Sequence, residues 1–296
     1  MGAKLRVVRR RIRSVQSTMK ITRAMELIAA SRIVKAQSRV ESARPYAELL
    51  TRAMEDVARQ TGALVHPLRE ERESPERAGV LVVTSDRGLA GSYNSNILRL
   101  AESVMTEIRD RGVESVVYVT GKKGISYFRF RGVPMAEQWS GFSEVPPYSA
   151  ADRIGRRLIE DFGERKIDEL HTVYTDFRSA FTLRAARKRF LPVSPNELQS
   201  RKGRVHPEYI FEPAPATILD ELLPQYVITK VYAALLESAA SENAARRRAM
   251  KAATDNAEEL IKVLTRQANR ARQDEITTEI MEIVGGSEAL GKASGE

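Results

Sequence analysis

The sequence has no cysteine, few aromatic residues and no long hydrophobic run. The lack of cysteine excludes disulfide bonds, thiolate metal sites and cysteine nucleophiles. No stretch approaches about 18 consecutive apolar residues, which argues against a membrane-spanning helix, and no apolar core follows the basic N-terminus as it would in a signal peptide. We therefore expect a soluble, cytoplasmic protein. Aromatic residues at 6% and charged residues at 29% are more typical of long two-sided helices than of one compact core.

Glycine and proline are missing from two long segments, residues 3–44 and residues 225–284. Because these two residue types most often interrupt helices, both segments are predicted to be helical. A helix of about 60 residues is roughly 90 Å long, far more than its own domain can cover. Such a helix must pair with another helix or sit inside a partner. Pro45 predicts a kink or restart in the first helix, and Gly285-Gly286 predicts the end of the second.

Both segments carry the heptad spacing of a coiled coil, in which apolar residues recur at alternating three- and four-residue steps. In the second segment the seam is clearest at Met250, Ala253, Ala257, Leu260, Leu264, Ala268 and Ala271. In the first segment only Thr22 and Glu26 interrupt it, and its members are Leu5, Val8, Ile12, Val15, Met19, Ala29, Ile33, Ala36, Val40, Ala43, Ala47, Leu50, Met54 and Val57. The two segments are predicted to pair as an antiparallel coiled coil.

A second apolar stripe accompanies the interruption in the first seam, at Ile21, Met25 and Ile28. A helix with two apolar faces over a short stretch has two neighbours there. A local stagger within one seam would give the same spacing, so both interpretations stay open.

The net charge of +9 is concentrated in the first helix and suggests an acidic partner. One candidate is nucleic acid, which would make the chain a basic coiled-coil nucleic-acid-binding protein. The other is an acidic protein surface. The basic residues are interleaved with the seam and do not precede it, and this weakens the comparison with DNA-binding zippers.

Between the helices the periodicity changes to alternating strands and helices. Buried-strand runs at 80–83, 116–119 and 170–174, an edge strand at 181–190, and helices at 95–110, 125–130 and 152–162 predict a small α/β domain with a mostly parallel sheet. The boundaries are drawn as an N-terminal coiled-coil helix 1–60, a linker 61–78, a Rossmann-like α/β domain 79–193, a loop 194–216, a C-terminal coiled-coil helix 217–285 and a tail 286–296.

No catalytic or metal-binding arrangement can be recognised. Gly88 and Gly91 follow the first strand, where a nucleotide would bind, but they give only G-x-x-G, and neither a dinucleotide fingerprint nor a phosphate-binding P-loop occurs. A tight turn is the simpler role of this loop. The three histidines lie far apart, without the spacing of metal ligands. We predict a non-enzymatic chain with no cofactor and no metal.

Several long motifs in the same order resemble the gamma subunit of rotary F-type ATP synthases, from one end of the chain to the other. They are KITRAME at 20–26 with AASR at 29–32, RPY at 44–46, the loop 85–94, AMKAATDNA at 249–257, Arg272-Gln273, and Ile276-Thr277 with Glu279 and Glu282. One departure is visible, since Gly286 is followed by Ser287 where the family usually has alanine.

This resemblance implies a non-catalytic central-stalk rotor. In the family the terminal helices thread the hexamer of alpha and beta subunits, and the α/β domain forms a foot on the epsilon subunit and the polar loops of the c-ring. It further implies one copy per complex, no nucleic acid, and membrane contact only through the c-ring, at the cytoplasmic face of the bacterial cell membrane. Positions matching the hexamer contacts of the family are Lys20, Arg23, Met25, Arg272, Gln273, Thr277 and Glu282. Positions matching the foot are Arg44, Tyr46, Tyr209 and Glu212.

Overall fold

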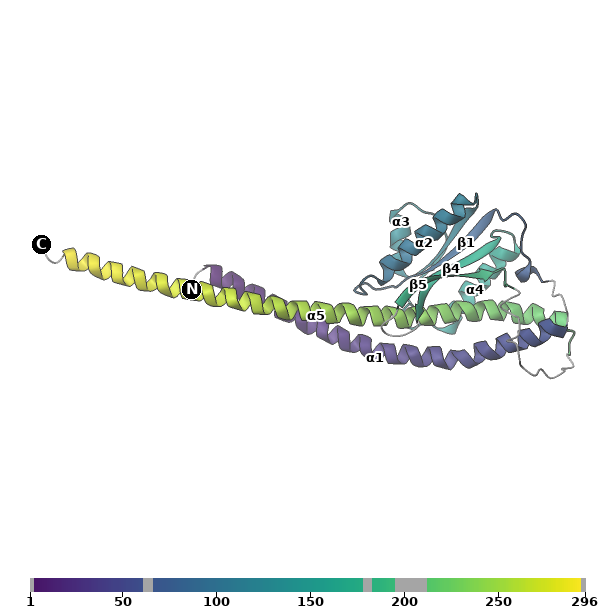
Figure 1. Cartoon of the computed structure of the whole chain (residues 1–296), viewed down its shortest axis with the longest axis horizontal. Helices are drawn as coiled ribbons and strands as arrows, with labels where there is room; N and C mark the ends of the chain where they lie inside the picture. Colours follow the sequence, from purple (N-terminus) through teal and green to yellow (C-terminus); the bar gives the residue numbers. More distant parts are fainter. Residues whose placement is uncertain (1–2, 61–65, 178–182, 195–211, 294–296) are drawn as a thin grey trace. The chain divides into compact units, whose positions relative to one another are not determined.

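The computed structural model describes residues 3–60, 66–177, 183–194 and 212–293. The chain divides into two units, one made of residues 1–28 and 247–296 and the other of residues 29–246. Two long helices, α1 (Ala3–Gln60) and α5 (Pro215–Ala293), contribute a segment to each unit (Figure 1). No helix in these described ranges is long and apolar enough to cross a membrane.

Both helices run through residues that were expected to interrupt them. Helix α1 is continuous through Pro45, so the predicted restart there does not occur. Helix α5 begins ten residues before Gln225, includes Pro224, and continues through Gly285 and Gly286 to Ala293. The predicted stop at the glycine pair is therefore wrong. A glycine costs a helix only about 1 kcal/mol, and the residues that follow, Glu288 to Leu290, favour helix.

The first unit is a pair of helices whose seam includes a polar contact. Oγ1 of Thr22 lies 2.8 Å from Oγ1 of Thr254, and both threonines are buried. Heptad steps away from this contact, in opposite directions along the two helices, place Ile12 opposite Leu264 and Leu5 opposite Ala271. Leu5 and Leu264 are each 3% exposed, as a seam requires. Thr22 thus belongs to the seam that it was expected to interrupt.

One predicted seam residue is wrong. Leu260 is exposed, whereas Ile261 is half-buried. Steps of three or four residues after Ala257 both satisfy a heptad pattern, so spacing alone could not choose between Leu260 and Ile261. In the register set by the threonines, Ile261 faces Val15, and this pairing decides which of the two is covered.

The second unit contains a five-stranded sheet with the strand order β3-β2-β1-β4-β5. Its strands are β1 (Arg77–Val83), β2 (Glu114–Thr120), β3 (Met135–Trp139), β4 (Glu169–Phe177) and β5 (Leu183–Leu191). The first four are parallel and β5 is antiparallel to β4. The mostly parallel α/β sheet is confirmed, and the predicted edge strand corresponds to β5, whose antiparallel direction was not predicted. Strand β3 was not predicted either, because its sequence MAEQW alternates half-buried and exposed positions.

Helices cover both faces of this sheet (Figure 1). Helices α2 (Tyr93–Asp110) and α3 (Lys122–Phe130) pack on the face formed by Val80 and Val82 of β1. Leu81 and Val83 point to the opposite face, where they pack with α4 (Tyr148–Gly163), the first half of α5 and the end of α1. A short 3-10 helix, η1 (Pro67–Arg69), leads into β1. The long helices are therefore part of the core of the α/β unit.

Candidate functional site

The carboxyl edge of a parallel sheet is the usual ligand site, at the point where the strand order reverses. Here that point lies between β1 and β4, and α5 passes across it. The hydroxyl of Tyr93 donates to the carbonyl of Ser238 (3.3 Å), and Oγ of Ser241 donates to the carbonyl of Thr175 (3.4 Å). The place where a nucleotide would lie is thus occupied by a helix of the same chain.

The backbone amides at this edge are also used internally. Asp86, which follows β1, accepts hydrogen bonds from the backbone N–H groups of Lys122 (3.1 Å), Gly141 (2.8 Å) and Ser143 (3.0 Å). Lys122 is the first residue of α3, and N–H groups at such a helix start commonly bind phosphate. A phosphate at this position would be repelled by the carboxylate of Asp86, which already accepts the hydrogen bonds that these N–H groups donate. This arrangement favours the interpretation of the Gly88–Gly91 loop as a turn, with Leu89 and Gly91 at positive φ.

The two histidines in the described part of the chain, His66 and His171, make structural contacts. His66 accepts a hydrogen bond from the backbone N–H of Leu68, and burial lowers the pKa of its imidazole. His171 lies 3.3 Å from Glu169. Burial of Glu169 acts to raise its pKa, but hydrogen bonds from His171 and Arg111 prevail and lower it to about 2. His206 lies outside the described residues. Across the described ranges, no three acidic or histidine side chains come close enough to hold a metal ion.

The predicted hexamer-contact residues all lie in the two-helix unit, and none of them is buried in its seam. Lys20 and Arg23 are exposed and Met25 is half-buried, while Arg272, Gln273, Thr277 and Glu282 are exposed. The threonine register places Arg23 level with Ala253, which is 19 residues, or roughly 28 Å, before Arg272 along α5. The structure therefore separates these residues into two surfaces and does not bring them together.

The stripe at Ile21, Met25 and Ile28 is exposed over much of its area. Ile21 is 58% and Ile28 52% exposed, so more than half of the surface of each residue is left uncovered. The regular seam at Thr22 also removes the reason to invoke a local stagger, because the seam continues through that residue. This favours a second neighbour for the helix that is not part of the described chain.

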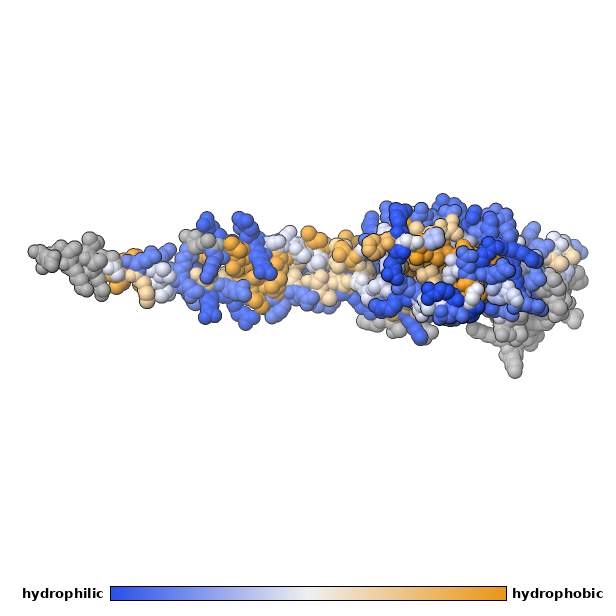
Figure 2. All heavy atoms as spheres, turned by 90° about the horizontal axis from the view of Figure 1, so that it is seen from above, coloured by the Kyte–Doolittle hydropathy of each residue, from blue (hydrophilic) through white to orange (hydrophobic). Residues whose placement is uncertain are grey.

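A second exposed apolar surface was missed in the sequence. The register leaves α5 from Ile276 onward opposite no described residue of α1, and apolar side chains stand open there: Ile276, Ile280, Met281, Ile283 and Val284, exposed by 44–72%. The recurrence of these apolar residues at three- and four-residue steps was visible in the sequence. This spacing continues along α5 beyond the end of its seam with α1. Figure 2 shows apolar side chains between hydrophilic ones on the visible face of the long helices.

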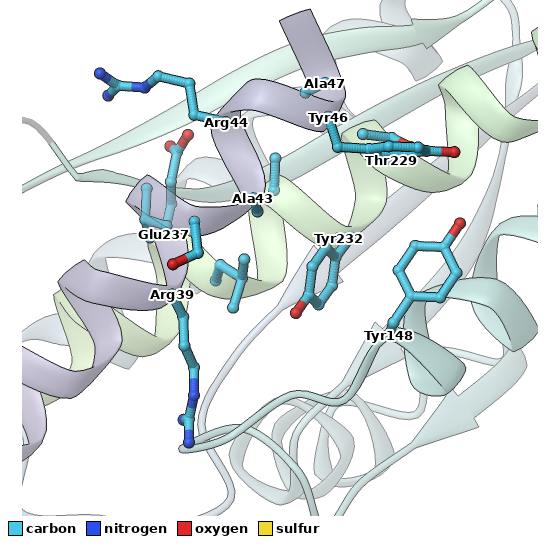
Figure 3. Close-up of a pocket in the computed structure, with 13 residues that line it drawn as sticks. Arg39, Ala43, Arg44, Tyr46, Ala47, Tyr148, Thr229, Tyr232 and Glu237 are labelled. Carbon is cyan, nitrogen blue, oxygen red and sulfur yellow. The ribbon is translucent and has the colours of Figure 1, made fainter. Parts of the chain in front are cut away.

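In the second unit, a cavity of about 460 Å³ lies between α1, α4 and α5 and includes two of the predicted foot residues, Arg44 and Tyr46 (Figure 3). Small residues, Ala43, Ala47 and Ala233, occupy the positions where α1 and α5 approach each other, which leaves this space open. The rings of Tyr148 and Tyr232 border it in an edge-to-face contact with centroids 5.3 Å apart. Arg39, Arg44 and Tyr46 are exposed, so a cationic and aromatic rim surrounds an interior that is largely but not entirely apolar.

Glu237 forms one wall of the cavity and titrates near neutral pH. Burial and a hydrogen bond with Asp176 of β4 raise its pKa to about 7, against the opposing effect of Lys188. The remaining predicted foot residues are not part of this cavity. Glu212 is exposed three residues before α5 begins, and Tyr209 lies outside the described residues.

Comparison with known proteins gives a consistent result. Residues 4–290 match the family model described as ATP synthase. The chain is 55% identical over 295 residues to the ATP synthase gamma chain of Acidothermus cellulolyticus, covering 98% of each, and 49% identical over 308 residues to that of Mycobacterium sp. (strain KMS), covering 99% of each.

Solved structures support the fold. A chain of the Euglena gracilis mitochondrial ATP synthase structure containing OSCP, F1 and c-ring aligns with a TM-score of 0.67 at 17% identity, covering 98% of this chain and 95% of that one. A chain of the Tetrahymena thermophila central stalk and c-ring structure aligns with a TM-score of 0.59 at 24% identity, covering 79% and 99%. Together with the paired helices and the α/β unit whose ligand crevice is filled, these matches show that the chain belongs to the ATP synthase gamma-chain family, the non-catalytic rotor subunit in the central stalk of that enzyme.

Proposed function

We propose that the exposed faces of the two-helix unit contact the hexamer of alpha and beta subunits. The observation that supports this proposal is that the seam of the unit is closed while apolar and basic side chains stand open on its outside. Lys20, Arg23 and Met25 form one contact surface, and Arg272, Gln273, Thr277 and Glu282 form the other. Cationic residues complement acidic loops of the beta subunits without tight pairing, so each contact can be released as the rotor turns.

The unit formed by residues 29–246 acts as the foot, which binds the epsilon subunit and the polar loops of the c-ring. Arg44 and Tyr46 at the cavity, together with Tyr209 and Glu212, are the residues we assign to it. Ion flow turns the ring, the ring turns the foot, and the helices cycle the catalytic sites in the beta subunits. The chain is present once per complex at the cytoplasmic face of the bacterial cell membrane, and it touches the membrane only through the c-ring.

Affinity isolation of the tagged full chain from membranes tests the partners. Co-purification of alpha, beta, epsilon and c subunits is expected, and their absence would overturn the proposal. Arg23→Glu then tests the hexamer surface, with Arg129→Glu on α3 as a control of equal charge change at another exposed arginine. We expect Arg23→Glu to reduce ATP-driven ion pumping and Arg129→Glu to leave it unchanged. Equal pumping in both variants would remove Arg23 from the contact surface.

A further inference from the structure

A cluster of charged side chains joins the loop after β3 to both long helices in the unit of residues 29–246. Glu144, in that loop, places Oε2 2.5 Å from Nη1 of Arg32 on α1 and Oε1 3.5 Å from Nη1 of Arg246 on α5. Arg246 in turn lies 2.6 Å from Glu242, one helical turn away, and donates to the carbonyl of Gly88 after β1. One carboxylate therefore bridges the two long helices within this unit, and its Oε2 also lies 3.4 Å from Nη1 of Arg87 in the loop after β1.

The part of the cluster on α5 and in the loop is largely removed from water, whereas the side chain of Arg32 on α1 is 39% exposed. The side chains of Glu242, Arg246 and Glu144 are 1%, 6% and 17% exposed. Burying charges is costly unless they are paired, and replacing such a cluster by apolar residues often does not reduce stability. Ion pairs of this kind are directional, however, and they fix one geometry where apolar contacts allow sliding. The cluster is thus better suited to holding the helices in position than to adding stability.

The sheet fixes the position of Glu144 through Asp86. The N–H groups of Gly141 and Ser143, in the same loop as Glu144, both donate to the Asp86 carboxylate, and Oγ of Ser143 accepts from the N–H of Asp86. Hydrogen bonds therefore run from the end of β1 to the loop, and ion pairs continue from the loop to Arg32 and Arg246. Each connection is between described residues of one unit.

The place of the cluster in the chain gives it a mechanical role. Arg246 is the last residue of its unit on α5, and Arg32 is the fourth residue of that unit on α1. Beyond them both helices continue into the other unit. We propose that Glu144 is the positioning residue that ties α1 and α5 to the α/β sheet, so that rotation of the sheet turns both helices without slip.

The test is Glu144→Gln in the assembled complex in membrane vesicles, with the ATPase rate and ATP-driven ion pumping measured together. The amide cannot hold the guanidinium groups of Arg32 and Arg246 as an ion pair. We expect hydrolysis to persist and pumping per ATP to fall at least about twofold, because loss of a directional contact permits slip. The matched control is Glu71→Gln, which removes an exposed ion pair to Arg189 (2.8 Å) and should leave the ratio unchanged. Normal pumping per ATP in Glu144→Gln would overturn the proposal.

A second variant covers the case in which Glu144→Gln fails to assemble. Glu144→Asp keeps the charge but is one methylene shorter, so it cannot reach both arginines as glutamate does. The proposal requires reduced pumping per ATP in that variant. Normal coupling in Glu144→Asp together with failed assembly of Glu144→Gln would assign Glu144 to folding alone and overturn the proposal. Coupled pumping by the Glu71→Gln complex would show in either case that the rotor assignment itself stands.

Discussion

Replacing Thr22 and Thr254 with cysteine should allow a disulfide to join α1 and α5 at the register of their seam. The two hydroxyl oxygens are 2.8 Å apart, so sulfur atoms in the same places need to approach by less than about 1 Å to reach a bond of roughly 2.05 Å. The protein has no cysteine of its own, so no competing pairing or background reaction exists.

The cysteine replacement and the disulfide change the free energy of unfolding in opposite directions. The double replacement loses one hydroxyl contact, a cost of about 1 kcal/mol. The disulfide closes a loop with a sequence separation of 232 residues, for which chain entropy predicts a gain of about 5 kcal/mol as an upper bound. The oxidised variant should therefore unfold at higher denaturant concentration than the reduced variant, by an amount corresponding to at most about 5 kcal/mol. Relative to the unmodified chain, which keeps the hydroxyl contact, the gain is at most about 4 kcal/mol.

Non-reducing gel electrophoresis of the full chain measures the crosslink, and a second cysteine pair controls for proximity alone. Ile12→Cys with Leu264→Cys is also in register and should close. Ile12→Cys with Ala257→Cys is one heptad, or about 10 Å, out of register and should stay open. Equal crosslinking of the last pair would refute the register. In the assembled complex the oxidised Thr22→Cys, Thr254→Cys rotor should still pump. Loss of pumping that reductant restores would show that the helices move against each other during a turn.

Four further outcomes are expected. Ile12→Asp places a carboxylate in the seam opposite Leu264 and should prevent assembly or uncouple the complex, since an unpaired charge there is poorly solvated; normal assembly and pumping would take Ile12 out of the seam. Met25→Lys adds a cation to the outer surface and should leave assembly and ATP hydrolysis intact but lower pumping per ATP, whereas failed assembly would place Met25 inside. Calorimetry of the isolated chain with ATP or NAD should detect no binding, and micromolar binding lost in Gly91→Val would contradict this. The native pKa of Glu237 is raised to about 7 from 4.5, so protonation of Glu237 stabilises the fold below pH 4.5, and this contribution is lost as pH rises through 7. Glu237→Gln should therefore raise the melting temperature, relative to the unmodified chain, more at pH 8 than at pH 5. An equal shift at both pH values would contradict the assignment.

Sequence periodicity correctly predicted those parts of the molecule in which apolar residues recur at regular spacing because the helix packs against a single neighbour. The exposure of Lys20 and Arg23 follows from the seam, because residues between seam positions on a two-helix coil face outward. The choice of Ile261 over Leu260 did not follow, since it depends on the partner helix. Edge strand β3 was missed because its five residues, MAEQW, alternate half-buried with exposed positions and so carry no continuous apolar signal.

The charged cluster shows a different limit. Glu242 and Arg246 are four residues apart on α5, a spacing that predicts an ordinary exposed pair on a helix surface. The segment of α5 that carries them is buried by other parts of the unit, and the partners of Arg246, Glu144 and Gly88, belong to loops more than 90 residues earlier in the chain. Spacing within one helix holds no information about such neighbours, and no pattern in the sequence distinguished these two residues from the many other charged residues of α5.

The filled crevice connects the absence of ligand chemistry with the mechanical role of the chain. In an open parallel sheet, the carboxyl edge offers free backbone amides and a gap between strands. Here the carboxylate of Asp86 accepts hydrogen bonds from the backbone amides, and the part of α5 around Ser238 and Ser241 fills the gap between the strands. The same atoms that would bind a phosphate hold the loop of Glu144, and the same gap that would receive a nucleotide receives α5. A bound nucleotide would have to displace the helix that carries the torque, so on this sheet the two uses exclude each other.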